Sequence, residues 1–323
     1  MDQKIVYSII TPVYNREDCI SRCIDSVISQ LKLNITLEHI IVDDGSEDNT
    51  SLIIQDYAKK YTHIRFIQFL YNKGTNAARN EAIKAAKGEY CIILDSDDFF
   101  VDRALEIINN TRKLHCNYSY YLFAPDDKLD FFNKNSYLSK FDELELCYKD
   151  FLLDKINTDF IHICETRIMK MYPFDESLRI YEGVFFLRFY KEAQKIFFMK
   201  KVIAIRERSR DDSVTRTVLR TNNDAIKKRI ISNNLFLEWF GEDFIKYKAF
   251  DRLQFILSSL YQNYILLGDY KKAKSIENRI RDNSFCIDKK YFIIHKFKLG
   301  FLMKVYIRIG LIIKYNMLKK QLK

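Results

Sequence analysis

The sequence predicts an α/β domain with a mainly parallel sheet and helices on both faces, followed by a helical C-terminal region. Apolar runs of strand length alternate with helix-like stretches over the first hundred residues. These runs are almost wholly apolar, as expected for strands that helices cover on both faces. Beyond residue 216, helical periodicity replaces the alternation. We therefore expect a first domain at residues 1–216 and a helical region at residues 217–323.

Four apolar runs are the expected strands, at residues 5–10, 39–42, 64–69 and 90–94. Between them, apolar residues recur at helical spacing from Ile20 to Leu31, and Asn15 is the expected N-cap of that helix. Two further helices are expected at residues 50–60 and 75–87, the second ending at Gly88. In the C-terminal region, helices are expected at residues 223–240, 243–267 and 270–282, with a tight turn at Gly268.

Composition narrows the class of protein. With 48% hydrophobic residues the chain folds, and eight glycines and three prolines argue against linkers. The seven cysteines form no CxxC pair, which favours buried free thiols in a reducing compartment and disfavours a zinc site. No signal peptide and no apolar run of about twenty residues is present, so we expect a cytoplasmic protein.

The positive charge is concentrated at the C-terminal end. Residues 284–323 hold nine lysines and Arg308 against one acid, Asp288, which accounts for +9 of the net charge of +10. Aromatic and aliphatic residues alternate with these bases. Such a segment can lie on an anionic membrane, here the inner face of the plasma membrane. The alternative is a terminal helix that packs on the protein and exposes a lysine face.

Polar clusters follow three of the expected strands, at residues 11–16, 43–46 and 95–98. Because ligands bind at the carboxyl ends of strands in an open parallel sheet, this coincidence predicts a site at that edge. Asp95, Asp97 and Asp98 crowd three carboxylates into four residues, which a divalent cation such as Mn²⁺ or Mg²⁺ would relieve. The alternative is that Asp98 caps a helix starting near residue 102.

Residues 72–80 open the alanine-rich helix, where Lys73 and Arg79 would place positive charge near a diphosphate. A solvated helix start is the alternative. The cluster at 43–46 is, by itself, ordinary turn chemistry. Its place beside the other clusters makes it a candidate for binding a nucleotide base.

Together these segments resemble glycosyltransferase family 2, a family of inverting nucleotide-sugar transferases with the GT-A fold. The resemblance runs from Val6 to Arg216 and joins four motifs in order, at residues 8–16, 41–46, 72–80 and 88–98. It implies that residues of the first two motifs, Pro12, Tyr14 and Asp44, line the nucleoside pocket, with Asp44 at the base. It also implies that Asp95 and Asp97 form a DxD motif, with Asp97 the direct metal ligand, and that Arg79 lies near the donor phosphates or sugar.

Two later segments extend the resemblance. Residues 181–188 are similar to the acceptor-side segment, which carries a Glu-Asp pair with an arginine six residues after the aspartate. Counting back from Arg188 identifies Glu182 as the catalytic base, with Tyr181 in place of the glutamate. The alternative is that Glu182 caps a helix at 183–191. Residues 206–213 are similar to the loop that closes over the donor, so Arg206 and Arg208 would face the diphosphate unless they are a solvated charge run.

The resemblance implies a metal-dependent transferase that moves a sugar from a nucleotide-diphosphate donor, UDP-linked by default, to a hydroxyl of a saccharide acceptor. A lipid-linked acceptor and bacterial surface polysaccharide assembly (capsule, O-antigen or exopolysaccharide) are the expected setting. The rival hypotheses are a catalytically inactive, glycosyltransferase-like binding module and a nucleotidyltransferase. The latter should carry a glycine-rich basic loop after the first strand, where this chain has Thr11 to Tyr14. A dinucleotide oxidoreductase is disfavoured because this chain lacks a GxGxxG motif. No nucleic-acid partner is expected.

Overall fold

The computed structural model describes residues 5–33, 35–135, 137–156, 158–179, 181–207 and 222–321. The chain forms two compact units, Met1–Arg210 and Asp211–Lys323, which we call the N-terminal and the C-terminal unit. Each is described by itself. The expected boundary between residues 216 and 217 lies outside the described residues.

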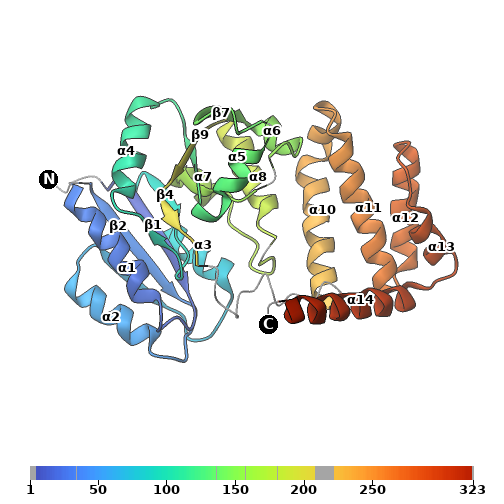
Figure 1. Cartoon of the computed structure of the whole chain (residues 1–323), viewed down its shortest axis with the longest axis horizontal. Coiled ribbons are helices and arrows are strands. Elements are labelled where there is room, and N and C mark those ends of the chain that lie inside the picture. The colour runs from blue at the N-terminus through green and yellow to red at the C-terminus, as the bar shows by residue number, and fades with distance from the viewer. Residues whose placement is uncertain are drawn as a thin grey trace. The chain divides into compact units, whose positions relative to one another are not determined.

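An eight-stranded sheet forms the N-terminal unit (Figure 1), in the order β3-β2-β1-β4-β8-β6-β9-β7. The strands β1 to β4 are mutually parallel, β8 runs antiparallel to both of its neighbours, and β6 pairs with β9 in parallel. A second sheet pairs β5 (Phe99–Phe100) with β10 (Ala204–Ile205). The main strands are β1 Tyr7–Val13, β2 Leu37–Asp43, β3 Ile64–Gln68, β4 Tyr90–Ile93, β6 Tyr120–Ala124, β7 Glu143–Cys147, β8 Ile161–Glu165 and β9 Lys195–Val202.

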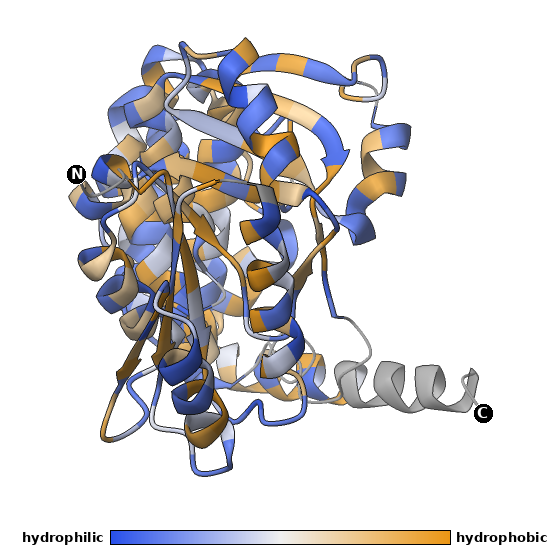
Figure 2. Ribbon diagram, turned by 90° about the vertical axis from the view of Figure 1, so that its left-hand side faces the viewer, coloured by the Kyte–Doolittle hydropathy of each residue, from blue (hydrophilic) through white to orange (hydrophobic). Residues whose placement is uncertain are grey.

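Helices cover both faces of the sheet, as the apolar strands predicted. Alternate residues of β1, such as Tyr7 and Ile9, pack in one core with the apolar sides of α1 (Ile20–Ile28), α2 (Thr50–Lys60) and α4 (Ala104–Leu114). The other face meets α3 (Thr75–Ala85) and α7 (Thr166–Met171). Figure 2 shows much of the sheet in the colours of hydrophobic residues, with hydrophilic residues on some strands. The remaining helical segments are η1 Ser29–Leu33, η2 Asp126–Lys128, α5 Leu129–Lys134, α6 Tyr148–Leu152 and α8 Gly183–Ala193.

Two predicted helix ends are wrong for a tertiary reason. Asn15 is not an N-cap, because α1 begins only after Cys19; the Asn15 side chain accepts a hydrogen bond from the backbone N–H of Glu47 at 2.8 Å. Gly88 does not end α3, which stops at Ala85. A Cβ on Gly88 would lie 2.5 Å from the backbone nitrogen of Ser8, so glycine here permits a close approach to β1.

The C-terminal unit is helical, with α11 in contact with each of the other helices. The expected helix break at 241–242 is wrong: α10 continues through Gly241, and the break follows at Lys248, which has a φ of 55°. The expected turn at Gly268 is confirmed by its left-handed φ of 78°. The helices are α10 Asn223–Lys246, α11 Phe250–Leu267, α12 Tyr270–Asp282, α13 Lys289–Lys296 and α14 Gly300–Gln321.

All seven cysteines are free. Cys19, Cys23, Cys91 and Cys164 are buried as expected, whereas two others are exposed because they fall after helix ends, at Cys116 and Cys286. Within the described ranges, no helix combines the length and the apolar character needed to cross a membrane.

Candidate active site

The predicted polar clusters meet at one edge of the sheet. In the parallel registers, Val13 of β1 lies beside Asp43 of β2, and Ile10 lies beside Ile93 of β4. Hydrogen bonds continue past the strand ends, from the Asp44 N–H to the Val13 carbonyl at 2.8 Å. The segments at 11–16, 43–46 and 95–98 therefore share the carboxyl edge, as the sequence predicted.

A single arginine joins two carboxylates at this edge. Arg79 of α3 donates from Nη2 to Oδ1 of Asp95 at 2.9 Å and from Nη1 to Oε1 of Glu182 at 3.2 Å. We call this group the Arg79 bridge. Its members come from α3, from the loop after β4 and from the start of α8. It brings together three residues that the sequence assigned separately to the donor, the metal and the base.

Opposite charges shift the pKa values of Asp95 and Arg79. Partial burial opposes the charge on Asp95, but the charge and hydrogen bond of Arg79 outweigh it and hold the pKa of Asp95 below its ordinary value. Burial likewise opposes the charge on Arg79, yet Asp95 and Glu182 raise its pKa. The Nε of Arg79 is buried and has no hydrogen-bond partner among the described residues. The Nε–H of this guanidinium is therefore a hydrogen-bond donor that the described residues leave unused.

Glu182 does not cap α8. It stands at the N-cap position, but its side chain makes no hydrogen bond to the backbone of the first turn. The side chain instead faces Arg79 and is only 17% exposed. This geometry favours the chemical role of Glu182 over the capping alternative.

The loop after β4 crowds its carboxylates. Asp98 does not cap α4, which begins at Ala104; its Oδ1 accepts a hydrogen bond from the Glu207 N–H at 3.0 Å. Burial, together with the charges of Asp95 and Asp97, raises the pKa of Asp98 to about 8. The repulsion expected from the sequence is therefore present at this site.

These residues fit a hard divalent cation as a partial ligand set. No group of three His, Cys, Asp or Glu side chains is arranged to hold a metal in the described part of the chain. Asp95 and Asp97 supply at most two carboxylates, and the Asp95 side chain is 46% exposed. Mg²⁺ and ions like it are commonly held by one or two carboxylates, with water and substrate phosphates as the other ligands.

The predicted nucleoside residues line the next stretch of the edge. Pro12 is buried within β1, and Tyr14, just beyond it, is 37% exposed. The carboxylate of Asp44 accepts hydrogen bonds from the backbone N–H groups of Lys73 at 2.7 Å and Gly74 at 2.9 Å. Burial raises the pKa of Asp44. Asp44 therefore also fixes the loop that opens α3, while each oxygen keeps a second lone pair.

The expected closing loop is only partly described. Arg206 donates to the Phe160 carbonyl at 3.1 Å and pairs with Asp159 at 3.4 Å. Its backbone N–H donates to Asp126. These contacts engage the guanidinium with other segments of the same unit. Arg208 lies outside the described residues.

The sequence analysis missed Arg179. Arg179 is exposed. Partial loss of solvent and the charge of Arg79 lower the pKa of Arg179, while the charges of Asp95 and Glu182 act in the opposite direction. The charge of Arg179 therefore acts on the same carboxylates as Arg79, without a direct contact among the described residues. Its position three residues before Glu182 was the available signal.

Comparison with known proteins agrees with this geometry. Residues 8–172, just over half of the chain, match the family described as Glycosyl transferase family 2. The chain belongs to this family, and the N-terminal unit contains its glycosyltransferase domain.

Two curated relatives come from bacteria. GalNAc(5)-diNAcBac-PP-undecaprenol beta-1,3-glucosyltransferase of Campylobacter jejuni is 29% identical over 213 residues, which cover 64% of this chain and 66% of the relative. Poly(ribitol-phosphate) beta-glucosyltransferase of Bacillus spizizenii is 46% identical over 99 residues, which cover 30% of this chain and 16% of the relative. The matched regions thus span less than two thirds of each relative's own length.

Solved structures share the fold. S. aureus TarS 1-349 in complex with UDP-GlcNAc aligns with a TM-score of 0.59 at 18% identity, over 87% of this chain and 93% of TarS 1-349. Mannosyltransferase PcManGT from Pyrobaculum calidifontis, in complex with GDP-Man and Mn²⁺, aligns with a TM-score of 0.55 at 13% identity, over 95% and 88% of the two chains. These likenesses confirm the expected GT-A-like α/β fold.

Proposed function

We propose that this protein transfers a sugar from a nucleotide-diphosphate donor, UDP-linked by preference, to a saccharide hydroxyl with inversion at the anomeric carbon. The Arg79 bridge carries the proposal, because it joins the first aspartate of the DxD motif to the candidate base at the edge where the family's motifs meet. Support for a UDP sugar comes from TarS, whose solved complex holds UDP-GlcNAc.

In this proposal Glu182 takes the proton of the acceptor hydroxyl as that oxygen attacks the anomeric carbon. The bond from that carbon to the diphosphate breaks on the opposite face, and the nucleoside diphosphate leaves. Asp95 and Asp97 would hold a divalent cation, Mn²⁺ or Mg²⁺, which when bound would supply positive charge to the leaving diphosphate. Arg79 orients Asp95 and Glu182 relative to one another, and Pro12, Tyr14 and Asp44 bind the nucleoside.

A donor panel tests the proposal. Purified protein is incubated with nucleotide sugars, with and without Mn²⁺, and release of nucleoside diphosphate is measured with and without saccharide acceptors. We expect Glu182→Gln and Asp97→Ala to lower transfer by about 10²–10⁴-fold in protein that remains folded. Glu192→Gln is the matched control, since Glu192 also lies on α8 but bonds to Tyr172 and lies outside the Arg79 bridge. Near-normal transfer by Glu182→Gln would refute the assignment of the base.

The rival hypothesis of an inactive binding module makes a different prediction. It rests on Tyr181, which stands where the family pair has glutamate. An inactive module would bind a nucleotide sugar, detectable by calorimetry, and release no nucleoside diphosphate from any donor. That result would replace the transferase proposal.

The proposed setting is assembly of a bacterial surface polysaccharide on a lipid-linked acceptor. Support comes from the relatives, since one is named for an undecaprenol-linked acceptor and another for poly(ribitol phosphate). Both relatives are named as glucosyltransferases and come from bacteria.

We further propose that the C-terminal unit contacts an anionic membrane through residues 284–323. Helix α14 begins against α11, where Gly300 approaches the Ile265 carbonyl closely and Met303 is buried. On another side of α14, five large apolar side chains at helical spacing are exposed, namely Phe301, Leu302, Val305, Tyr306 and Ile309. Lys304 and Arg308 flank this stripe, the pattern of a helix at a membrane interface.

Vesicle co-sedimentation tests this contact. We expect the full chain to bind vesicles containing phosphatidylglycerol more strongly than neutral ones, and Phe301→Ser with Tyr306→Ser to reduce that binding by about tenfold. Lys59→Glu with Lys60→Glu, at the end of α2, is the control: it changes the charge of the protein outside residues 284–323 and should leave binding to the vesicles intact. Equal binding of the wild type to neutral and anionic vesicles would contradict the proposal.

A further inference from the structure

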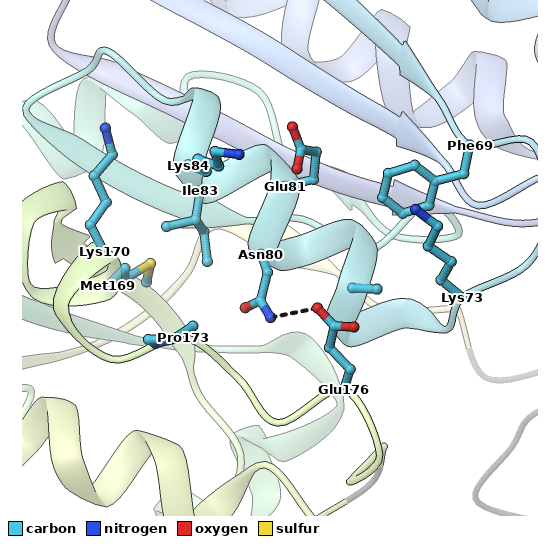
Figure 3. Close-up of a pocket in the computed structure, with 11 residues that line it drawn as sticks. Phe69, Lys73, Asn80, Glu81, Ile83, Lys84, Met169, Lys170, Pro173 and Glu176 are labelled. Atoms are coloured by element: carbon cyan, nitrogen blue, oxygen red, sulfur yellow. Dashed lines mark hydrogen bonds between the residues drawn. The ribbon is translucent and has the colours of Figure 1, made fainter.

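A pocket of about 540 Å³ lies along α3, apart from the Arg79 bridge. Its walls are one side of α3, the loop before that helix and residues 169–176 (Figure 3). The volume falls in the range of roughly 300–1,000 Å³ found for small-ligand sites. The pocket is therefore large enough to be a binding site in its own right.

One wall of the pocket is the segment that leads to Glu182. Asn80 binds both backbone groups of Phe174, with its Nδ2 to the carbonyl at 2.9 Å and its Oδ1 to the N–H at 2.9 Å. Arg79, the residue before Asn80, points instead to Asp95 and Glu182. Consecutive residues of α3 thus serve the two sites, and the segment around Phe174 separates them.

The pocket also runs from one edge of the sheet toward the other. Phe69 and Lys73 lie at the start of α3, near the carboxyl edge, and Met169 and Lys170 lie toward its far end (Figure 3). A helix of eleven residues is about 16 Å long. An elongated ligand therefore fits the pocket better than a compact one.

The pocket carries a surplus of positive charge. Three lysines line it, Lys73, Lys84 and Lys170, and all three are exposed. The Nζ of Lys73 lies 4.3 Å from the centre of the Phe69 ring, and that of Lys170 donates to the Ala86 carbonyl at 2.8 Å. The lysines outnumber the acids Glu81 and Glu176, so the lining favours an anion.

The rest of the lining suits a sugar. Phe69 and Pro173 offer apolar surface for the C–H faces of a pyranose ring, and an aromatic ring serves this contact well. Glu176 accepts a hydrogen bond from Asn80 at 3.4 Å through Oε1 and offers its second carboxylate oxygen to hydroxyl groups. A lipid chain would use only the apolar contacts, and bare phosphate would use only the polar and charged ones.

We propose that this pocket binds a negatively charged saccharide, a part of the acceptor glycan remote from the hydroxyl that is attacked. The charge is a carboxylate, as in a uronic acid, or a phosphodiester, and Lys73, Lys84 and Lys170 pair with it. The identification of the ligand as an acceptor rests on the proposed transferase function. The proposal that the pocket binds a negatively charged saccharide does not depend on that function.

Binding to the full chain tests the pocket directly. Three probes of equal length are titrated and followed by calorimetry or ligand-observed NMR: a uronate-containing tetrasaccharide, a tetrasaccharide with phosphodiester links and a neutral tetrasaccharide. We expect at least one anionic probe to bind at least tenfold more tightly than the neutral one. The anionic probe that binds more tightly identifies the source of the charge.

Charge reversal provides the second arm. Lys84→Glu with Lys170→Glu should weaken the anionic probe at least tenfold, and Lys84→Gln with Lys170→Gln should weaken it less, at an unchanged unfolding temperature. Lys60→Glu with Lys113→Glu, on α2 and α4 across the sheet, makes the same change in charge and should leave binding intact. Wild-type affinity in both pocket variants, or a neutral probe that binds as well as the anionic ones, would overturn the proposal.

Enzyme assays separate this inference from the proposed function. The pocket variant should raise KM for a charged acceptor while donor hydrolysis without acceptor stays normal. Glu182→Gln should lose transfer and retain probe binding. A wild-type protein that neither hydrolyses a donor nor transfers its sugar would count against the transferase function. The binding experiment alone decides whether the pocket binds a negatively charged saccharide.

Discussion

Each unit of this chain buries a charged side chain among opposite charges, but the partners come from different places. In the N-terminal unit, Arg79 takes its partners from the loop after β4 and the start of α8, at sequence distances of 16 and 103 residues. In the C-terminal unit, Glu277 of α12 pairs with Lys274 and Arg281 of its own helix, at 2.9 and 3.0 Å. His295 of α13 completes that second group.

The exposed members of the two groups carry opposite charge. In the Arg79 bridge the side chain of Asp95 is 46% exposed, so a carboxylate faces solvent. In the second group the carboxylate of Glu277 is 3% exposed, and the exposed members are the cations Lys274 and Arg281, at 59% and 54%. A group assembled from distant segments that leaves a carboxylate exposed fits a cation site, whereas a group built mainly within one helix around a buried carboxylate fastens α12 to α13 through His295. The comparison teaches that the origin of the partners and the sign of the exposed charge, not burial alone, distinguish function from stability.

The largest expected effect comes from a substitution that breaks the Arg79 bridge. Arg79→Met leaves two carboxylates without their cation, so we expect transfer to fall more than 100-fold and the unfolding free energy to fall by about 3 kcal/mol. Enzyme assay and urea unfolding measure the two effects. Arg167→Met is the matched control, because Arg167 also faces two carboxylates, Glu165 and Glu192, but is 60% exposed. Its loss should cost under about 1 kcal/mol. Equal losses in both variants would contradict the assigned role.

The second expected effect is a difference between the two units in how their stability depends on pH. His39 of β2 is fully buried against Thr11, and burial, with a smaller contribution from His63, lowers its pKa to about 3. The unfolded chain binds a proton near pH 6.5, so the stability contributed by neutral His39 is lost as the pH falls from 6.5 toward 3. Between pH 7.5 and pH 5 the contribution of His39 should fall by about 2 kcal/mol. The raised pKa of Asp98 acts in the opposite direction over this interval, so the difference between the wild type and His39→Gln, measured by amide hydrogen exchange in the N-terminal unit, isolates the effect.

The C-terminal unit should respond at lower pH. Burial opposes the charge on Glu277, but hydrogen bonds from Lys274 and Arg281 outweigh it and lower its pKa. Its contribution is present above the unfolded value near 4.5 and is lost as the pH falls through the folded pKa. Glu277→Gln should therefore cost about 1–2 kcal/mol at pH 7 and leave transfer per folded molecule unchanged. A tenfold loss of transfer would show that the group is not merely structural.

Much of the fold follows from local pattern. The bounds of α2 and α12 coincide with their expected ranges, because apolar periodicity and flanking polar residues mark them within a short stretch of chain. Asn15 and Gly88 were misjudged because each is a good capping residue that a distant segment uses differently, Glu47 in one case and Ser8 in the other. Tertiary contact outweighs local preference at such positions.

The site was predictable in its parts and not in its connections. Asp95 and Glu182 stand out by motif, and Arg79 by its helix, but no local pattern places one guanidinium between the two carboxylates. Arg179 was missed because it falls in no motif. The pocket along α3 was not predictable either, since it depends on how residues 169–176 pack against that helix.

The smallest expected effects concern glycine. In the N-terminal unit Gly88 is required by close contact, whereas in the C-terminal unit a Cβ on Gly268 or Gly241 would meet nothing within 4 Å. Gly268 has a φ of 78°, so Gly268→Ala should cost about 1 kcal/mol through backbone strain alone. Gly241 lies inside α10, where alanine is the better helix former, and Gly241→Ala should stabilise the unit by about 0.5–1 kcal/mol. Urea unfolding of both variants measures the opposite signs. A destabilising Gly241→Ala would mean that α10 does not continue through residue 241 in solution, and the helix break would then return to the place where the sequence alone put it.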